Sequence, residues 1–299
     1  MPKICYVSRS FAPSSRELID KANAIIDEYE AQGFDLTLRQ LYYQMVARDF
    51  IANKVKEYNR LKNIVSDARL AGLIDWNRIV DLTRELRQNA HWESPESIVG
   101  ACAEQYAIDK WEDQPHRVEV WVEKDALRNV VERACTAIDV PFFVCRGYTS
   151  QSEMWSAAQR FIRWSKRGQE PIIFHLGDHD PSGIDMSRDI QERLNLFGAD
   201  VDVRRIALNM PQIEEFEPPP NPAKETDSRF AAYMTEYGDE SWELDALSPE
   251  TLDGLIRRAV TAVLNKKRWK EAQRREADQK AELESASTRW DEVRELLDG

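Results

Sequence analysis

Hydrophobic residues recur every three or four positions through the first 70 residues, and this spacing predicts three helices. The first opens at SSRE (14–17), a capping box in which Ser14 caps the helix and Glu17 reaches back, and it ends near Gly33. The second opens at another capping box, TLRQ (37–40), and the third runs from about Lys56 to Leu70.

After the third helix, the stretch LIDWNRIVDLT alternates loosely between apolar and polar residues, which predicts a short hairpin. Three helices followed by a β-wing are the outline of a winged helix-turn-helix, a DNA-binding unit. We therefore assign residues 1–95 to a winged-helix domain.

From about residue 117 to 208 short apolar runs alternate with longer amphipathic stretches. The predicted strands are 117–123, 141–147, 171–178 and 201–208, and the predicted helices are 124–138, 150–168 and 182–198. This alternation predicts the α/β class, with a mainly parallel, Rossmann-like sheet covered on both faces.

The rest of the chain is a proline-containing loop at 209–229, in which prolines should prevent regular helix, and a helical C-terminal tail. The predicted domains are a winged helix at 1–95, a linker at 96–116, an α/β metal-binding domain at 117–250 and the tail at 251–299.

Composition excludes several classes of protein. In 299 residues no apolar run reaches the roughly 18 residues of a membrane span, and the first residues lack the layout of a signal peptide. The four cysteines are scattered without a CxxC pair, which argues against a zinc site or a disulfide framework. We expect a cytoplasmic, nucleoid-associated protein that binds no membrane.

The net charge of −12 is unusual for a nucleic-acid binder, but the distribution of charge matters more than its sum. Residues 37–90 contain ten Lys or Arg and six Asp or Glu, a local charge of +4 in an acidic chain. This segment is a candidate DNA-binding surface, and an ordinary mixed, solvated surface explains the charges equally well.

The stretch GDHDPSG places Asp178 and Asp180 at the end of the third predicted strand, while Glu123 ends the first. If these strands are neighbours, the three carboxylates meet at the same edge of the sheet. Oxygen ligands of this kind suit Mg²⁺, or Mn²⁺. The alternative is structural, with Asp180 capping the following helix and Glu123 exposed to solvent.

VEK before a helix, followed at a distance by GDHDPSG, resembles the Toprim domain of topoisomerases, primases and some nucleases. The form D-x-D-P-x-G is most similar to the A subunit of type IIB topoisomerases, the topoisomerase VI class, and to its meiotic double-strand-break relative. In that family a winged helix carries the catalytic tyrosine, and RQLYY (39–43) stands in the expected place. The chain resembles a short, stand-alone A subunit of the kind found on phages and mobile elements.

Helical spacing separates the two tyrosines of RQLYY. Tyr42 belongs to an apolar stripe with Leu38, Leu41 and Met45, and we expect it to be buried. Tyr43 lies about 100° further round, off this stripe, with Arg39 one turn before it. A guanidinium there favours the phenolate and can hold a phosphate, so Tyr43 is the candidate nucleophile and Arg39 its catalytic partner. A surface tyrosine packed under an arginine is the alternative.

The third helix carries a row of polar side chains at helical spacing, suited to contacting DNA phosphates. This row is Asn59, Lys62, Ser66 and Arg69. Lys124, next to Glu123, is a further candidate for a phosphate contact.

Together these residues predict Mg²⁺-dependent cleavage of double-stranded DNA by tyrosine transesterification. The resemblance implies a link to the 5′ phosphate, a homodimer in which each tyrosine works with the partner's metal site, and a separate ATPase B-type subunit. Two alternatives remain open: a Toprim nuclease that uses metal-bound water, and a non-catalytic DNA-binding protein.

Overall fold

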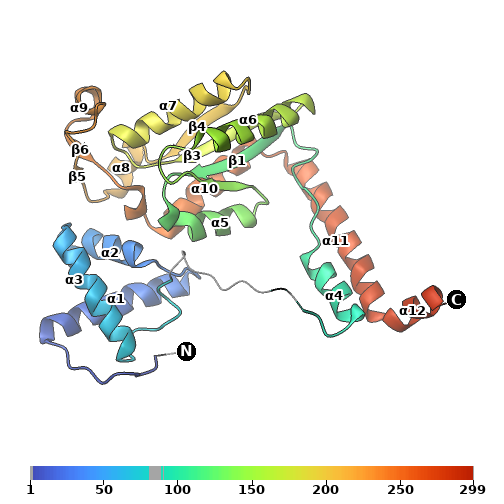
Figure 1. Ribbon diagram of the computed structural model, residues 1–299, viewed down its shortest axis with the longest axis horizontal. Helices are drawn as coiled ribbons and strands as arrows, with labels where there is room; N and C mark the ends of the chain where they lie inside the picture. The colour runs from blue at the N-terminus through green and yellow to red at the C-terminus, as the bar shows by residue number, and fades with distance from the viewer. Residues whose placement is uncertain (1–2, 81–88, 90, 299) are drawn as a thin grey trace.

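The computed structural model describes residues 3–80, 89 and 91–298. Its N-terminal part consists of three helices packed together, as predicted (Figure 1). They are α1 (Pro13–Ala31), α2 (Leu38–Ala47) and α3 (Val55–Leu70).

Only one of the two predicted capping boxes forms. The Thr37 hydroxyl accepts the Gln40 backbone N–H at 3.2 Å, and the Gln40 side chain accepts the Thr37 N–H at 2.8 Å, which fixes the start of α2. The prediction for Ser14 is wrong. Pro13 already occupies the first turn of α1, so Ala12 becomes the capping residue and no side chain caps this end.

The predicted hairpin after α3 is absent from the part of it that lies within the described residues, 73–80. This segment forms turns and pairs only through an isolated bridge between Leu36 and Ile79. The rest of the predicted wing, from residue 81, lies outside the described residues.

The α/β class is confirmed by a four-stranded parallel sheet in the order β2-β1-β3-β4. Its strands are β1 (His116–Val122), β2 (Phe142–Val144), β3 (Glu170–Leu176) and β4 (Asp202–Ala207). Val122 of β1 lies opposite Leu176 of β3, so these two central strands end at the same level.

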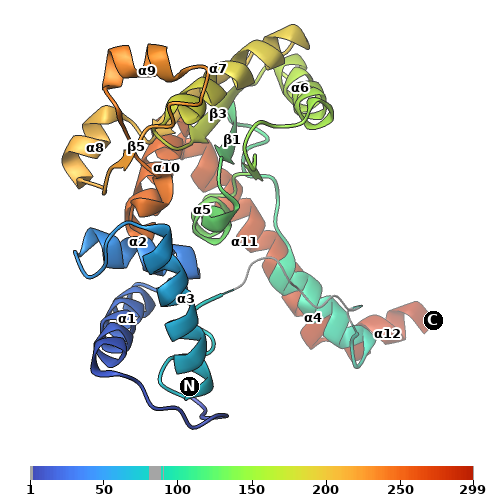
Figure 2. The same ribbon diagram turned by 60° about the vertical axis from the view of Figure 1, so that its left-hand side comes forward.

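Helices cover both faces of the sheet (Figures 1 and 2). One face carries α5 (Arg128–Thr136) and α10 (Pro249–Val263), and the other carries α6 (Gln151–Lys166) and α7 (Pro181–Leu196). Alternate residues of β1 serve the two faces: Val120 joins one buried cluster and Trp121 the other. Apolar packing on both sides explains why these strands are hydrophobic throughout.

The segment predicted as a loop at 209–229 holds a short helix, α8 (Met210–Phe216), and strand β5 (Asn221–Pro222). Pro211 is tolerated because it lies in the first turn, where its missing N–H has no helical partner. Strand β5 pairs with β6 (Glu240–Ser241), and α9 (Phe230–Tyr237) lies between them.

Two segments far apart in sequence form a helical arm beside the sheet domain (Figure 2). In this arm α4 (Pro95–Gln105), which falls in the predicted linker, packs along α11 (Lys266–Thr288), and α12 (Trp290–Asp298) follows. The predicted helical tail is thus confirmed, although α10 packs on the sheet. Within the described part of the chain, every helix is too short or too polar to span a membrane.

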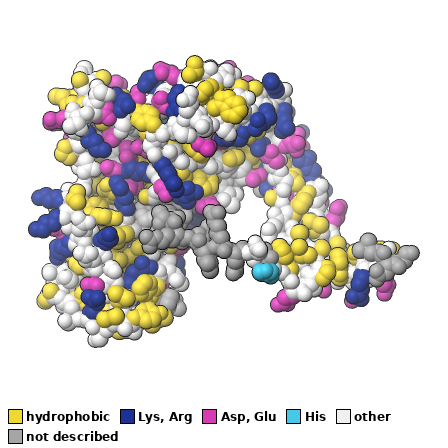
Figure 3. All heavy atoms as spheres, viewed as in Figure 1, with side chains coloured by type: hydrophobic (Ala, Val, Ile, Leu, Met, Phe, Trp, Pro, Cys, Tyr) yellow, Lys and Arg dark blue, Asp and Glu magenta, His cyan; other side chains and the backbone are white. Residues whose placement is uncertain are grey.

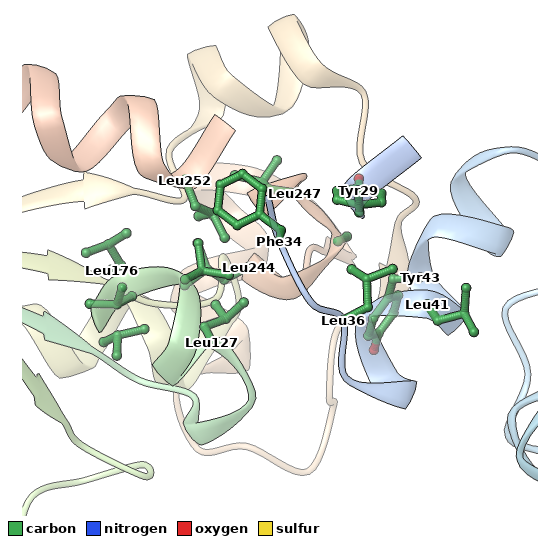
Figure 4. Packing of buried hydrophobic residues seen from close by; sticks show 14 of the residues in the cluster. Tyr29, Phe34, Leu36, Leu41, Tyr43, Leu127, Leu176, Leu244, Leu247 and Leu252 are labelled. Carbon is green, nitrogen blue, oxygen red and sulfur yellow. The ribbon is translucent and has the colours of Figure 1, made fainter. Parts of the chain in front are cut away.

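The N-terminal helices share a hydrophobic core with the sheet domain (Figure 4). Leu36, Leu41 and Tyr43 lie in one continuous cluster with Leu127 and Leu244. Leu244 belongs to η2 (Leu244–Ala246), a single turn that packs against α2. This packing brings α2 to the carboxyl edge of the sheet.

Candidate metal centre

The carboxyl ends of β1 and β3 bring Glu123 and Asp178 together, as the neighbouring of these strands predicts. The Glu123 backbone N–H donates to the Leu176 carbonyl at 2.9 Å, which continues the ladder by one residue. The Glu123 carboxylate then accepts the Asp178 backbone N–H at 3.0 Å. Glu123 therefore braces the loop that begins at Gly177.

A compact acidic cluster forms at this edge. One carboxylate oxygen from each of Asp178, Glu243 and Asp245 lies within 4.8 Å of the other two. The Asp178 carboxylate also accepts the Leu244 backbone N–H at 2.7 Å, which anchors the η2 turn and places Glu243 and Asp245 on either side of it. This cluster can hold a metal ion.

Sequence reasoning missed Glu243 and Asp245. Their spacing in WELDA repeats the one-residue gap of GDHDPSG, and this repeated gap is the only local signal. No strand end is predicted there, because the turn becomes part of the site only through its packing against β3 and α2.

Two cations already contact the cluster. The Lys124 ammonium lies 3.0 Å from Asp178 Oδ1 and 2.9 Å from Asp245 Oδ1, and it also contacts Glu243. Arg39 Nε lies 2.9 Å from Asp245 Oδ2, and its Nη2 lies 3.4 Å from Glu243. Both cations were predicted to contact phosphate, and here both contact carboxylates.

Burial dominates the electrostatics of the edge. It raises the pKa of Asp178, and the neighbouring Glu123, Glu243 and Asp245 add to this effect against Lys124. Burial also raises the pKa of Glu123. For Lys124 burial acts in the opposite direction, but the three carboxylates of the cluster outweigh it and raise the Lys124 pKa above its ordinary value. The edge as a whole therefore favours bound positive charge.

Asp180 takes the structural position that the sequence left open as an alternative. Its carboxylate accepts the Gly183 N–H at 2.6 Å and the Ser182 hydroxyl at 3.0 Å, which caps α7. Asp180 still contributes negative charge beside Glu123 and Arg205. Its role as a metal ligand remains a prediction.

The residues at this edge fit a divalent cation. Asp245 is fully buried, and its Oδ2 faces Arg39 but accepts no hydrogen bond. Glu123 and Asp180 form no ion pair within the described ranges. Arg205 directs its donors to the carbonyls of Gly177, Asp178 and Gly183 rather than to these carboxylates. Oxygen ligands with surplus negative charge suit Mg²⁺ or Mn²⁺.

His175 lies inside β3 and is fully buried, as the sequence predicts. His179 is also buried, and its Nδ1 lies 2.7 Å from the Tyr233 hydroxyl. The rings of Tyr237 and Trp242 enclose it further. His179 therefore fastens the loop between Asp178 and Asp180 to the β5–β6 region.

Gly183 should be indispensable to this loop. A Cβ added at Gly183 would overlap the Asp178 carbonyl oxygen, which belongs to rigid backbone. We expect Gly183→Ala to lower the free energy of unfolding by about 1–3 kcal/mol, measured by urea titration.

Gly254→Ala, in the middle of α10, is the matched control. Its added Cβ would meet only the movable Arg258 guanidinium. Alanine favours helix over glycine by about 0.5–1 kcal/mol, so this variant should be unchanged or slightly more stable. Equal stability of Gly183→Ala and wild type would contradict the close backbone packing of the loop.

Tyr43 is buried, and the prediction that it lies off the packed side of its helix is wrong. The residue is only 6% exposed, because η2 covers the side of α2 that the first stripe leaves open (Figure 4). Burial, with Asp245 and Glu243, raises its pKa to about 12 against the opposing effect of Arg39 and Lys124. Arg39 does lie beside the ring, 5.7 Å from its centre, but it does not produce a net preference for phenolate.

A cavity of about 470 Å³ connects the candidate tyrosine with the acidic edge. Arg39, Tyr43, Asp180, Lys224 and Glu243 all contribute to its lining. Tyrosine and acids therefore face one space within a single chain. The resemblance implies instead that the tyrosine meets the metal site of a partner chain.

The predicted DNA row on α3 is only partly available. Asn59, Lys62 and Ser66 are exposed, and Figure 3 shows basic side chains gathered around the N-terminal end of α3. Arg69 instead donates to the carbonyls of Trp76 and Ile79, the latter at 2.9 Å, and stacks 4.8 Å from the Trp76 ring. Its guanidinium is thus engaged in holding the segment after α3.

Substitutions of Lys62 and Arg69 should therefore have different effects. Lys62→Ala should leave stability within about 0.5 kcal/mol of wild type, while it weakens DNA binding and lowers the salt slope by about one. Arg69→Ala should cost about 1–3 kcal/mol of unfolding free energy, because two carbonyls lose their donor. Urea titration and fluorescence anisotropy with labelled duplex measure the two effects. Unchanged DNA affinity in Lys62→Ala would move the DNA surface away from α3.

Comparisons with protein-family models, with curated proteins and with solved structures gave no match. The N-terminal helices, the parallel sheet and the acidic cluster are consistent with a Toprim-like fold. They define the chain as an α/β protein with a buried acidic cluster that can hold a metal ion.

Proposed function

We propose that the chain cleaves DNA strands in a reaction that depends on a divalent cation. One observation carries the proposal: α2 packs against the acidic edge, so that Arg39, Tyr43, Asp180 and Glu243 line one cavity. A phosphodiester in this cavity would meet a cation-binding edge and a hydroxyl at the same place. The exposed basic residues around α3, beside the cavity, provide the attraction for the DNA backbone.

Each group has a role in this proposal. Asp178 with Glu123 and Asp180, or with Glu243 and Asp245, would hold the ion, either Mg²⁺ or Mn²⁺. When bound, such an ion would stabilise negative charge on the scissile phosphate. Arg39, whose side chain is half exposed, would hold the phosphate by two hydrogen bonds. Lys62 and its exposed neighbours on α3 would position the duplex without reading its sequence.

The first form of the proposal uses Tyr43 as the nucleophile. Its oxygen would form a bond to phosphorus while the bond from phosphorus to a deoxyribose oxygen breaks, and the phenol proton would leave to a base. This exchange conserves the number of phosphodiester bonds, which makes it reversible. The resemblance to the topoisomerase VI A subunit supports this form and implies a 5′ phosphotyrosyl link.

The second form is a nuclease in which water is the nucleophile. A specific observation favours it: Tyr43 is buried, and its pKa is raised to about 12. A buried neutral phenol is a poor nucleophile at neutral pH. The tyrosine route requires α2 to move relative to η2 when DNA binds, and the water route does not.

Supercoiled plasmid incubated with the protein and Mg²⁺, then quenched with detergent, tests both forms. DNA ends that enter a gel only after protease treatment would support tyrosine chemistry, and free ends would support the nuclease. Absence of any strand break, with DNA still bound, would leave the third candidate, a DNA-binding protein without catalysis. Double-stranded DNA, a homodimer and a separate ATPase subunit are the partners that we propose on the resemblance.

A further inference from the structure

The acidic cluster already contains a cation that belongs to the chain itself. Lys124 Nζ lies among carboxylate oxygens of Asp178, Glu243 and Asp245, at 3.0 Å from the first and 2.9 Å from the last. These same three side chains offer the group of oxygens that can hold a metal ion. The ammonium therefore stands where an ion bound by the cluster would stand.

A second observation indicates that an ammonium does not fully satisfy this position. Asp245 is 0% exposed, yet its Oδ2 accepts no hydrogen bond. A buried carboxylate oxygen without a partner is costly, and a metal ion can coordinate it from a direction that the Lys124 and Arg39 donors do not reach. The backbone on this side is fixed, because the Leu244 N–H donates to Asp178.

We infer that Asp178, Glu243 and Asp245 form a divalent-cation site, and that Lys124 and the ion compete for it. This site is distinct from the predicted set Glu123, Asp178 and Asp180, with which it shares only Asp178. Lys124 cannot stay among the three oxygens when a doubly charged ion enters, because like charges at contact distance repel strongly. Its flexible four-carbon stem allows the ammonium to withdraw without movement of the backbone.

The inference deepens the proposed function and concerns the ion that cleavage would use, but its test requires no DNA. Mn²⁺ is titrated into the DNA-free full-length protein and free Mn²⁺ is followed by electron paramagnetic resonance. Lys124→Met keeps the length of the side chain and removes its charge. We expect this variant to bind Mn²⁺ about tenfold more tightly than wild type, or better.

Lys110→Met is the matched control. Lys110 is as little exposed as Lys124, at 14%, and its ammonium pairs with Glu276 at 2.6 Å. Asp139 is its second acidic neighbour, at 3.7 Å, so it faces two carboxylates rather than three. Removing this lysine should leave Mn²⁺ binding unchanged.

Double variants locate the ion. The gain in Lys124→Met should disappear when Asp245→Asn is added, and it should survive the addition of Asp180→Asn, because Asp180 lies outside the cluster. A folded Lys124→Met protein with the Mn²⁺ affinity of wild type would overturn the inference. A gain that depends on Asp180 instead of Asp245 would also overturn it.

A measurement on the wild-type chain keeps the test decisive if Lys124→Met does not fold. Acetylation by acetic anhydride, quantified by mass spectrometry, reports how accessible each lysine is. Acetylation of Lys124 should rise several-fold in saturating Mn²⁺, while that of Lys110 stays constant. Bound Mn²⁺ with unchanged Lys124 acetylation would overturn the competition. Competition without any DNA cleavage would leave the inference standing and contradict the proposed function.

Discussion

Asp178→Asn should reduce Mg²⁺-dependent strand cleavage by about a hundredfold or more. Asp178 belongs to both candidate sets of ligands, so no arrangement of the ion avoids it. The amide keeps an oxygen that can accept the Leu244 N–H, which is the contact that anchors η2. Unfolding free energy should therefore change by less than about 1 kcal/mol, and a plasmid nicking assay at fixed Mg²⁺ measures the loss.

Asp202→Asn is the control for this substitution. Asp202 begins β4 at the opposite edge of the sheet and pairs only with the exposed Arg204, at 2.6 Å. It should cleave plasmid at the rate of wild type. Full cleavage by Asp178→Asn, with the protein folded, would remove the acidic edge from the reaction altogether.

Tyr43→Phe should abolish the covalent protein–DNA adduct and, if no water route operates, all strand cleavage. The change removes one hydroxyl and keeps the ring that packs with Leu36 and Leu41, so fold and DNA affinity should be retained. Adducts are counted after detergent quenching, by the DNA that enters a gel only after protease treatment. Undiminished cutting with free ends would establish water as the nucleophile.

Tyr42→Phe separates the two neighbouring tyrosines. The Tyr42 hydroxyl donates to Asn53 Oδ1 at 3.1 Å, on the other side of the helix from η2. Its loss should cost about 1 kcal/mol of stability and leave cleavage intact. Loss of the adduct in Tyr42→Phe, but not in Tyr43→Phe, would transfer the reaction to Tyr42.

A mixture of Tyr43→Phe and Asp178→Asn proteins tells whether one chain suffices. Because Tyr43, Asp180 and Glu243 line one cavity of the same chain, we expect the mixture to stay inactive. Nicked plasmid with protein attached, formed only in the mixture, would show that each tyrosine works with the acids of a partner. That outcome would support the shared site implied by the resemblance, and it would require α2 to leave η2.

Much of the fold follows from local pattern. The strands and helices of the sheet domain form where apolar runs alternate with amphipathic stretches, because a parallel sheet buried on both faces needs both patterns. The box at Thr37–Gln40 forms as predicted, since its hydrogen bonds are made between residues three apart. Glu123 and Asp178 meet because both follow the ends of neighbouring parallel strands.

Tertiary structure decided the rest of the site. Helical spacing left Tyr43 free, but η2, some 200 residues later in the chain, covers it and raises its pKa. Glu243 and Asp245 enter the cluster through the same turn, and Lys124 turns to them rather than to solvent. Sequence periodicity describes which side of one element is apolar. Burial and charge at an edge depend on which elements meet there, and contacts between distant segments set both.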